Sequence, residues 1–322
     1  MINPMNGRLV SSPDRPSYER LPELAGMGVR HAWEVWGPGD TLGTLNHLTD
    51  DVCLRALALP RFGRRLNLSL PLTMPDPPLY GRPLLRHRVF ERNRNMIEDV
   101  LEVLDPQASS QWDSLRHIKA RECGFYGGEP DWDSAAARDL GVHNLASRGL
   151  VARGVLLDLP AYWAAQGAEV DAFSERAVGA DELRAVADAQ RVSFATGDVL
   201  LVRTGWLSRY RAVGQLPNDH LTMPTCVGLA ADEGVAAFLW DNAFAALVAD
   251  NPAVEVLPGD PAVGSLHRRL IPALGMPLGE LWDLDVLADQ CAAIERYEFL
   301  LVSVPLNVPG GVASPANAMA VL

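Results

Sequence analysis

Three apolar runs, separated by segments with a helical pattern, constrain the fold of this chain more than any other feature. They read G-V-L-L-D-L-P from Gly154, G-D-V-L-L-V-R from Gly197 and A-A-L-V-A-D-N from Ala245. Continuous hydrophobicity over so few residues is typical of strands buried on both faces. Helices are predicted at 181–189 and 232–242, between the runs. The alternation of strand and helix predicts an α/β fold with a mixed sheet.

The chain is predicted to form one domain with a short N-terminal arm. No long linker, internal repeat or low-complexity tract divides its 322 residues, and a chain of this length can bury a sizeable core. Residues 1–30 are polar and proline-rich, and we expect them to become ordered on the body or on a neighbouring subunit. Residues 31–322 are then the α/β domain.

Composition excludes several classes of function. The formal net charge of −12 argues against nucleic-acid or anionic-membrane surfaces, because both favour clustered Lys and Arg. The four cysteines are scattered without a C-x-x-C pair, so we expect reduced thiols in a cytoplasm. No apolar run is long enough to cross a bilayer, and the first residues lack a signal-peptide pattern. These features predict a soluble, cytoplasmic protein that binds neither nucleic acid nor a membrane.

The segment at 106–117, P-Q-A-S-S-Q-W-D-S-L-R-H, concentrates polar side chains. If it is extended, Gln111, Asp113 and Leu115 share one face, because strand side chains alternate. Asp113 and His117 would then meet one metal ion or one substrate atom near the end of the strand. The alternative is a polar edge strand whose aspartate and histidine only satisfy backbone groups.

This segment resembles a degenerate copy of the H-x-G-T-H-x-D-x-P-x-H motif of the cyclase family that includes bacterial kynurenine formamidases and isatin hydrolases. Asp113 and His117 match the motif, whereas Gln107 and Gln111 stand at its first two histidines. Further similarity lies in W-G-P-G-D-T-L-G-T-L-N at 36–46, in G-D-V-L-L-V-R-T-G-W at 197–206 and in 267–280. The resemblance implies a swivelling β/β/α fold with a barrel-like sheet.

The resemblance also implies a metal centre. Relatives with the full motif hold up to two divalent ions, and a late His and Glu complete the ligand set; here these are His267 and Glu280, one residue further apart than in the formamidases. An amide oxygen is a weak ligand beside an imidazole. The ion that the first two motif histidines bind in relatives should therefore be absent where Gln107 and Gln111 replace them. We expect Asp113, His267 and Glu280 to hold a single divalent ion, Zn or Mn.

Three hypotheses for function follow. The first is a hydrolase of an amide, formamide or cyclic amide bond that uses a metal-activated water, with His117 as acid/base. The second is a metal-free cyclase, dehydratase or hydrolase that uses Asp113 and His117, with Gln107 and Gln111 binding the substrate. The third is a binding protein without catalysis.

Other residues are candidates for contact with the substrate. C-G-F-Y-G-G places an aromatic pair on a loop that could form a wall of a pocket, and aromatic or polar residues lie in the motif or at strand ends. For the tryptophans the alternative is core packing. The candidates are Trp112, Tyr126, Arg203, Trp206 and Asn251. We also expect a homodimer or homotetramer.

Overall fold

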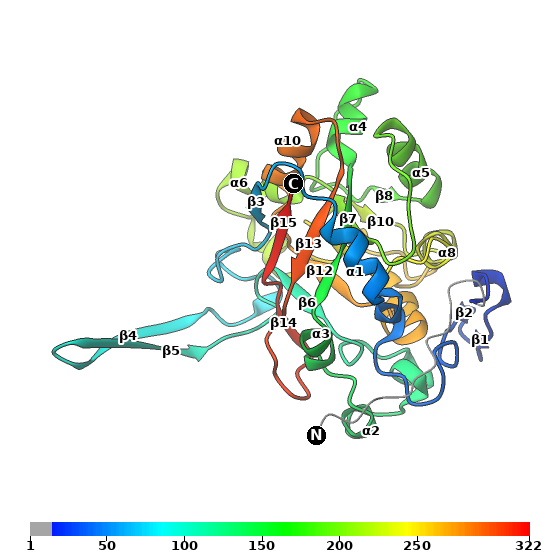
Figure 1. The fold of residues 1–322 in the computed structure, drawn as a ribbon, viewed down its shortest axis with the longest axis horizontal. Helices are drawn as coiled ribbons and strands as arrows, with labels where there is room; N and C mark the ends of the chain where they lie inside the picture. Colours follow the sequence, from blue (N-terminus) through cyan, green and yellow to red (C-terminus); the bar gives the residue numbers. More distant parts are fainter. Residues whose placement is uncertain (1–14) are drawn as a thin grey trace.

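A nine-stranded mixed sheet forms the centre of the computed structural model, which describes residues 15–322 (Figure 1). Four neighbouring strands in the middle of the sheet are parallel: β7 (Leu150–Asp158), β9 (Val199–Arg203), β11 (Ala246–Ala249) and β12 (Leu278–Glu280). The first three contain the apolar runs, so the prediction of buried strands is confirmed. Their carboxyl ends lie at one edge of the sheet.

Both faces of these strands are buried, which explains why their sequences do not alternate. Leu200 and Val202 pack in one apolar cluster, and Val199 and Leu201 pack in a second cluster. Because strand side chains point alternately to the two faces, the two clusters lie on opposite sides of the sheet. A strand with a core on each side needs apolar residues at every position.

Antiparallel strands extend the sheet on both sides, so that it is mixed and curls into a half-barrel. The full order is β14–β6–β12–β11–β9–β7–β13–β15–β3. The added strands are β6 (Gln111–Asp113), β14 (Ala313–Pro315), β13 (Glu298–Ser303), β15 (Ala318–Val321) and β3 (Arg65–Asn67). Strand β6 lies beside β12 and thereby brings the motif segment to the end of the parallel core.

Helices cover the two faces of the sheet. On one face pack α5 (Ala180–Ala189) and α8 (Glu233–Asp241), and on the other pack α1 (Asp50–Leu57) and α10 (Asp285–Ala293). Thr49 caps α1 by accepting a hydrogen bond from Val52 N. The remaining helices are α2 (Trp132–Ala137), α3 (His143–Arg148), α4 (Leu159–Ala165), α6 (Trp206–Val213), α7 (Asn218–Thr222) and α9 (Leu266–Arg268). No helix in the described part of the chain is long and apolar enough to span a membrane.

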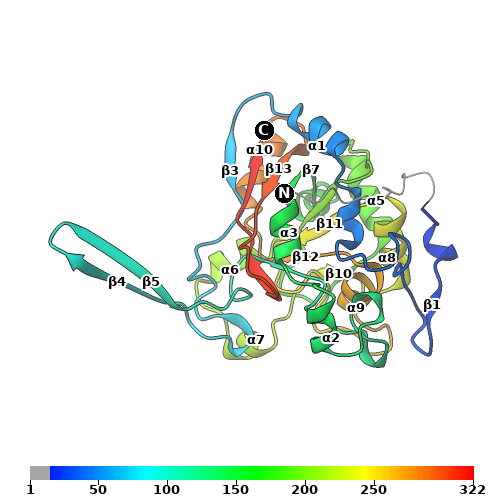
Figure 2. The same cartoon turned by 60° about the horizontal axis from the view of Figure 1, so that its bottom comes forward.

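Among residues 15–322, three two-stranded sheets lie outside the main sheet. The longest is a hairpin of β4 (Arg86–Asn93) and β5 (Met96–Val103), which projects far from the body (Figure 2). A short parallel pair joins β8 (Ala177–Val178) to β10 (Gly228–Leu229). In the N-terminal segment, β1 (Glu23–Leu24) pairs with β2 (Val29–Arg30).

The described part of the predicted arm lies against the body. Tyr18 N donates to Asp241 Oδ1 at 2.8 Å, and Trp240 Nε1 donates to Pro16 O at 2.9 Å. Both acceptor and donor side chains belong to α8. The rest of the arm, residues 1–14, lies outside the described residues, and the boundary at residue 30 stays a prediction.

Candidate metal centre

Strand pairing alone brings three of the motif side chains together. Strands β6 and β12 are antiparallel, with Gln111 opposite Glu280 and Asp113 opposite Leu278. Residues directly opposite each other in an antiparallel pair share a face, and Asp113 is on the same face as Gln111 because it is two residues further on. All three side chains are buried. The register therefore places two carboxylates beside one glutamine amide.

Glu280 ends strand β12. The leucine-rich sequence at 280–291 is typical of a helix, but no helix begins at Glu280. Leu278 and Gly279 pair with β11, and the same strand pairs with β6 on its other side. Leu281 then adopts a left-handed backbone conformation, with φ of 54°, and α10 begins only at Asp285. Pairing on both edges outweighs the helical propensity of this sequence.

His267 reaches the same place from a different element. It lies in α9, which continues into a π-helical turn (Arg269–Leu274). His267 Nε2 is 3.0 Å from Glu280 Oε1, and ligand atoms of Asp113, His267 and Glu280 all lie within 4.8 Å of one another. A π turn holds more residues than an α turn, so it can absorb the extra residue between His267 and Glu280. The structure brings the three predicted ligands together.

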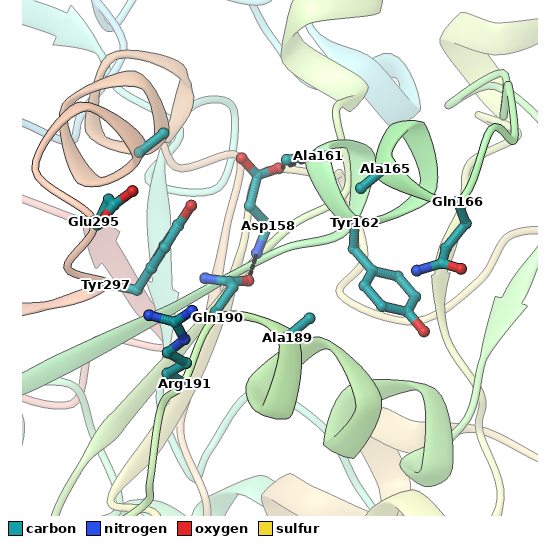
Figure 3. Close-up of a pocket in the computed structure, with 11 residues that line it drawn as sticks. Asp158, Ala161, Tyr162, Ala165, Gln166, Ala189, Gln190, Arg191, Glu295 and Tyr297 are labelled. Atoms are coloured by element: carbon teal, nitrogen blue, oxygen red, sulfur yellow. Dashed lines mark hydrogen bonds between the residues drawn. The ribbon is translucent and has the colours of Figure 1, made fainter.

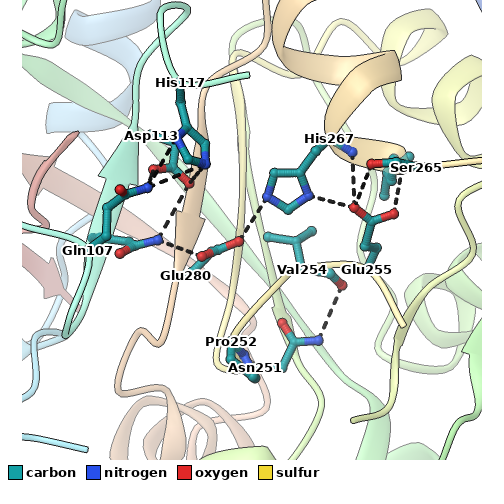
Figure 4. A network of polar contacts seen from close by, with 12 residues as sticks. Gln107, Asp113, His117, Asn251, Pro252, Val254, Glu255, Ser265, His267 and Glu280 are labelled. Atoms are coloured by element: carbon teal, nitrogen blue, oxygen red, sulfur yellow. Dashed lines mark hydrogen bonds and ion pairs between the residues drawn. The ribbon is translucent and has the colours of Figure 1, made fainter. Parts of the chain in front are cut away.

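Glu255 fixes the orientation of the His267 ring (Figure 4). Its Oε1 lies 2.7 Å from His267 Nδ1, and its Oε2 accepts from Leu266 N at 2.6 Å. With Nδ1 engaged, Nε2 is the ring atom turned toward Glu280. A carboxylate behind a ligating histidine is a recurrent feature of metal sites, since it sets the ring orientation and raises ligand basicity. No sequence pattern indicated this role for Glu255.

Electrostatics at the site reflects burial opposed by close partners. Burial lowers the pKa of His267, but hydrogen bonds to Glu255 and Glu280 outweigh it and hold that pKa well above its usual range. Burial, and next the charge of Asp113, raise the pKa of Glu280, although His267 opposes them. Two buried carboxylates this close repel each other when both are ionised. A cation between them would relieve that repulsion.

Each of the two glutamines donates a hydrogen bond from its side-chain amide to one of the carboxylates. Gln107 Nε2 donates to Asp113 Oδ1 at 2.8 Å and lies 3.2 Å from His117 Nδ1. Gln111 Nε2 donates to Glu280 Oε2 at 2.5 Å. Gln111 Oε1 is buried and has no hydrogen-bond partner in the described part of the chain. An orphaned carbonyl oxygen next to two carboxylates offers one more acceptor to a cation.

His117 lies at the boundary between this centre and open space. Its Nε2 is 3.9 Å from Asp113 Oδ2, and its ring centroid is 6.3 Å from that of His267. Both histidines line a cavity of about 300 Å³ together with Glu280. His117 is therefore placed to exchange a proton with a molecule in that cavity.

The donor set fits one divalent cation. Asp113, His267 and Glu280 supply two carboxylates and one imidazole, a set that suits Zn, Mn and other divalent ions. Glu255 supports the imidazole, and the neighbouring Gln111 oxygen is unsatisfied. A second site would need imidazoles where Gln107 and Gln111 stand.

The comparisons with known proteins assign a family. A family model described as "Putative cyclase" matches residues 66–256, which is more than half of the chain. The chain belongs to this cyclase family. The matched range includes Gln107 to His117 and Glu255, whereas His267 and Glu280 follow it. No curated protein matches the chain.

Solved structures share the fold. A crystal structure described as a novel cyclase is 26% identical, with a TM-score of 0.79 over 91% of this chain and 97% of that one. Isatin hydrolase A from Labrenzia aggregata is 15% identical, with a TM-score of 0.57 over 80% of this chain and 93% of its own. Isatin hydrolase A from Ralstonia solanacearum is 14% identical, with a TM-score of 0.57 over 80% and 91%. At these identities the two hydrolases show the fold alone.

The tryptophans predicted to touch substrate instead pack in the core. Trp112 points to the opposite face of β6 from Gln111 and Asp113, and its Nε1 donates to Ser303 Oγ at 2.8 Å. Trp206 begins α6 and stacks on Tyr210, with ring centroids 5.5 Å apart. Large rings that fill the space between elements contribute more as packing than they could at a wet surface. The core alternative is therefore correct for both.

Three further candidates also lie outside the cavity. Tyr126 is buried and donates from its hydroxyl to Asp40 Oδ2 at 3.0 Å. Arg203 forms ion pairs with Asp158 and Asp285 at the end of β9. Asn251 donates to Val227 O at 2.8 Å and so holds the loop that leads to Glu255. Each is occupied by an internal partner, which the sequence did not reveal.

Other residues line the cavity that the sequence did not single out. Tyr80 has a left-handed backbone with φ of 61° and donates to Pro252 O, and the Arg82 guanidinium lies 5.0 Å from the Tyr80 ring centroid. Arg82 also donates to Gln107 O. Ile118, Leu257 and Arg268 complete the wall. Only the position of Arg268 beside His267 could have indicated such a role.

Proposed function

We propose that this protein hydrolyses a carbon–nitrogen bond of a small molecule, an amide, formamide or cyclic amide, with the help of one divalent metal ion. The observation that carries the proposal is the convergence of Asp113, His267 and Glu280 within 4.8 Å in a buried site. Family membership and the shared fold with two isatin hydrolases support it. Asp113, His267 and Glu280 would hold the ion.

A metal ion there would supply a bound water of lowered pKa and would polarise the substrate carbonyl. The protein provides the rest. His117 can take a proton from the water and return it to the leaving nitrogen, because its imidazole faces the cavity and imidazole is the commonest general acid/base group. Gln107 lies within 3.4 Å of both ring nitrogens of His117 and within 2.8 Å of Asp113. It therefore holds the acid/base group against the ligand side chain.

The cavity is suited to a small substrate. Its volume of about 300 Å³ is at the lower end of the range for small-molecule sites. Apolar side chains of Ile118 and Leu257 line it together with polar ones of His117 and Glu280. Such a mixture orients a molecule that has one apolar side and one reactive polar group.

A metal-free reaction on the same residues is the second candidate. The observation in its favour is that both glutamine amides already satisfy the carboxylates, through Gln107 to Asp113 and Gln111 to Glu280. Asp113 and His117 would then act as an acid/base pair in a cyclisation, dehydration or hydrolysis. The two candidates differ in their need for a metal.

The experiment is an assay of amide cleavage with and without metal. A panel of formanilides and cyclic amides is tested with protein as purified, after treatment with chelator, and after a divalent ion is added back. The metal hydrolase predicts loss of activity with chelator and recovery with Zn or Mn. Activity that survives complete metal removal would favour the second candidate, and no cleavage in any state would contradict the first.

A further inference from the structure

A second cavity adjoins the one at the candidate metal centre. It has a volume of about 210 Å³ and lies between the β1–β2 turn and the loop that precedes α9. Gly26 and Met27 of the turn form part of its wall. Ser265 and Arg268 line both cavities. The two spaces therefore meet at these two side chains.

This second cavity, which we call the arginine cavity, is positively charged. Arg121, Arg268 and Arg269 line it, and no carboxylate is among the described residues of its wall. None of the three guanidinium groups forms an ion pair with a described carboxylate, although many other arginines of the chain do. Such a concentration of positive charge stands out in a chain of net charge −12.

The arginine groups retain unused hydrogen-bond donors. Arg269 Nε and Nη2 donate to the backbone oxygens of Ala231 and Val263. Burial raises the pKa of the neighbouring Tyr18 hydroxyl and the Arg269 charge opposes this larger effect, but Arg269 Nη1 itself is buried and makes no hydrogen bond of normal geometry to a described residue. Arg268 is half-buried and donates no hydrogen bond to a described residue. Guanidinium groups removed from water without acceptors lose free energy, and an oxyanion supplies acceptors of the right geometry.

Backbone conformation at the cavity points the same way. Arg121 adopts φ of 47°, in the left-handed region that a non-glycine residue rarely occupies. Strained positions of this kind persist where the surrounding structure holds them, and they concentrate at ligand sites. On the other side, Ser265 Oγ donates to Glu255 Oε1 at 3.1 Å, and Glu255 orients His267. The arginine cavity is thus joined to the residues that build the metal centre.

We propose that the arginine cavity binds an oxyanion of the substrate, a carboxylate or a phosphate, while the scissile carbon–nitrogen bond lies at the metal centre. The position of the scissile bond at the metal centre rests on the proposed function, whereas the oxyanion site does not. It assigns a substrate class: small amides that carry an anionic group at the end remote from the reacting carbonyl. Arg268 is the specificity residue because it lines both cavities.

Binding of simple probes tests the oxyanion site without any turnover. Benzoate, benzamide and inorganic phosphate are titrated calorimetrically into the full-length protein, into Arg268→Gln and into Arg121→Gln/Arg268→Gln. Arg184→Gln is the control, because Arg184 is an exposed residue of α5 that pairs with Asp181, lies over the Phe238 ring and does not line the arginine cavity. We expect benzoate or phosphate to bind more tightly than benzamide, and Arg268→Gln to weaken the anion about tenfold or more, the size expected for one lost hydrogen bond to a charged group.

The outcomes separate the two anions and separate binding from catalysis. Phosphate binding that depends on the two arginines, without benzoate binding, would assign a phosphate rather than a carboxylate. No preference for either anion over benzamide, or equal anion affinity in the arginine variants and the control, would overturn the proposal. Anion binding that is lost in Asp113→Asn but kept in Arg268→Gln would place the anion on the metal instead, and would also overturn it.

Turnover supplies the second readout. The pair 4-formamidobenzoate and 4-formamidobenzamide share one formamide bond and differ in the charge at the far end. We expect a higher kcat/KM for the carboxylate in the unmodified protein. Arg268→Gln should lose that preference because its KM for the carboxylate rises, and Arg268→Lys should restore part of it. Cleavage of both with equal kcat/KM would contradict the oxyanion site. Cleavage of neither, with the arginine-dependent binding intact, would contradict the proposed function and leave the oxyanion site standing.

Discussion

Individual side chains at the metal centre have separable tasks. Asp113 and Glu280 supply charge, His267 supplies a nitrogen, Glu255 fixes that nitrogen, and His117 faces the cavity. Of these, the sequence indicated Asp113 and His117 through the motif and His267 and Glu280 through the family resemblance at 267–280, and the structure brings them together. It could not indicate the task of Glu255, because only the fold shows that its carboxylate faces Nδ1 of His267.

Replacing His117 tests proton transfer. His117→Asn keeps a polar group of similar size but removes the imidazole that can accept and return a proton, so we expect kcat for amide cleavage to fall ~100-fold or more, as for other lost general acid/base groups. Metal content should not change, since His117 is not among the three ligands. A near-normal kcat in a metal-loaded variant would show that His117 is structural.

Replacing Glu255 tests the orientation of His267. Glu255→Gln removes the charge behind the ring but leaves a side chain of the same shape, so metal affinity should fall about 10- to 100-fold. The measurement is competition with a metal-binding dye, and Glu298→Gln is a control because Glu298, the first residue of β13, pairs with Arg153 and Arg296 and does not line the cavity. Equal affinities in the two variants would mean that Glu255 does not support a ligand.

Restoring the family histidines tests the interpretation of the glutamines. Gln107→His with Gln111→His should raise the metal stoichiometry toward two per chain, because imidazole binds divalent ions far better than a carboxamide does. Elemental analysis of the double variant beside the unmodified protein measures this. Unchanged stoichiometry in a folded double variant would show that these positions do not converge on an ion.

Among the secondary-structure elements, three buried strands could be predicted from the sequence and the exposed hairpin could not. Strands β7, β9 and β11 were predicted because both of their faces are buried, which leaves continuous apolar runs in the sequence. The exposed β4–β5 hairpin carries mixed apolar and charged residues and left no such signal. The alternating sequence L-N-L-S-L-P-L at 66–72 forms a strand only over β3 (Arg65–Asn67), and the strand that ends at Glu280 is followed by a leucine-rich sequence typical of a helix. These short strands form because they pair with strands distant in the sequence, and the local sequence carries no signal of that pairing.

Close packing around β12 should make the position of Glu280 sensitive to its neighbour. A Cβ added at Gly279 would lie 2.8 Å from Trp282 Nε1 and 2.9 Å from Val248 Cγ2. Gly279→Ala should therefore cost about 1–3 kcal/mol of unfolding free energy, the range for an overpacked core, and should weaken metal binding. Gly259→Ala is the matched control, because its nearest contacts are at 3.9 Å. Denaturant unfolding that shows equal stability for both variants would contradict this packing argument.

At the scale of the whole molecule, the β4–β5 hairpin supports the prediction of a homo-oligomer. An isolated two-stranded hairpin is marginally stable in water, and this one exposes Val89, Ile97 and Leu101 on a single face. A second copy of the chain that covers this face would stabilise it. We expect sedimentation analysis to give a homodimer or homotetramer, and a monomer at micromolar concentration would contradict this prediction.

The metal content of the protein decides whether Asp113, His267 and Glu280 hold an ion. Protein purified without chelator and without added metal is compared by elemental analysis with Asp113→Asn, which keeps the size of the side chain and removes its charge. We expect one divalent ion per chain in the unmodified protein. Asp113→Asn should lose most of this ion while its circular dichroism spectrum shows that it remains folded. No ion in the unmodified protein, or one full ion retained in Asp113→Asn, would contradict a centre built on Asp113, His267 and Glu280.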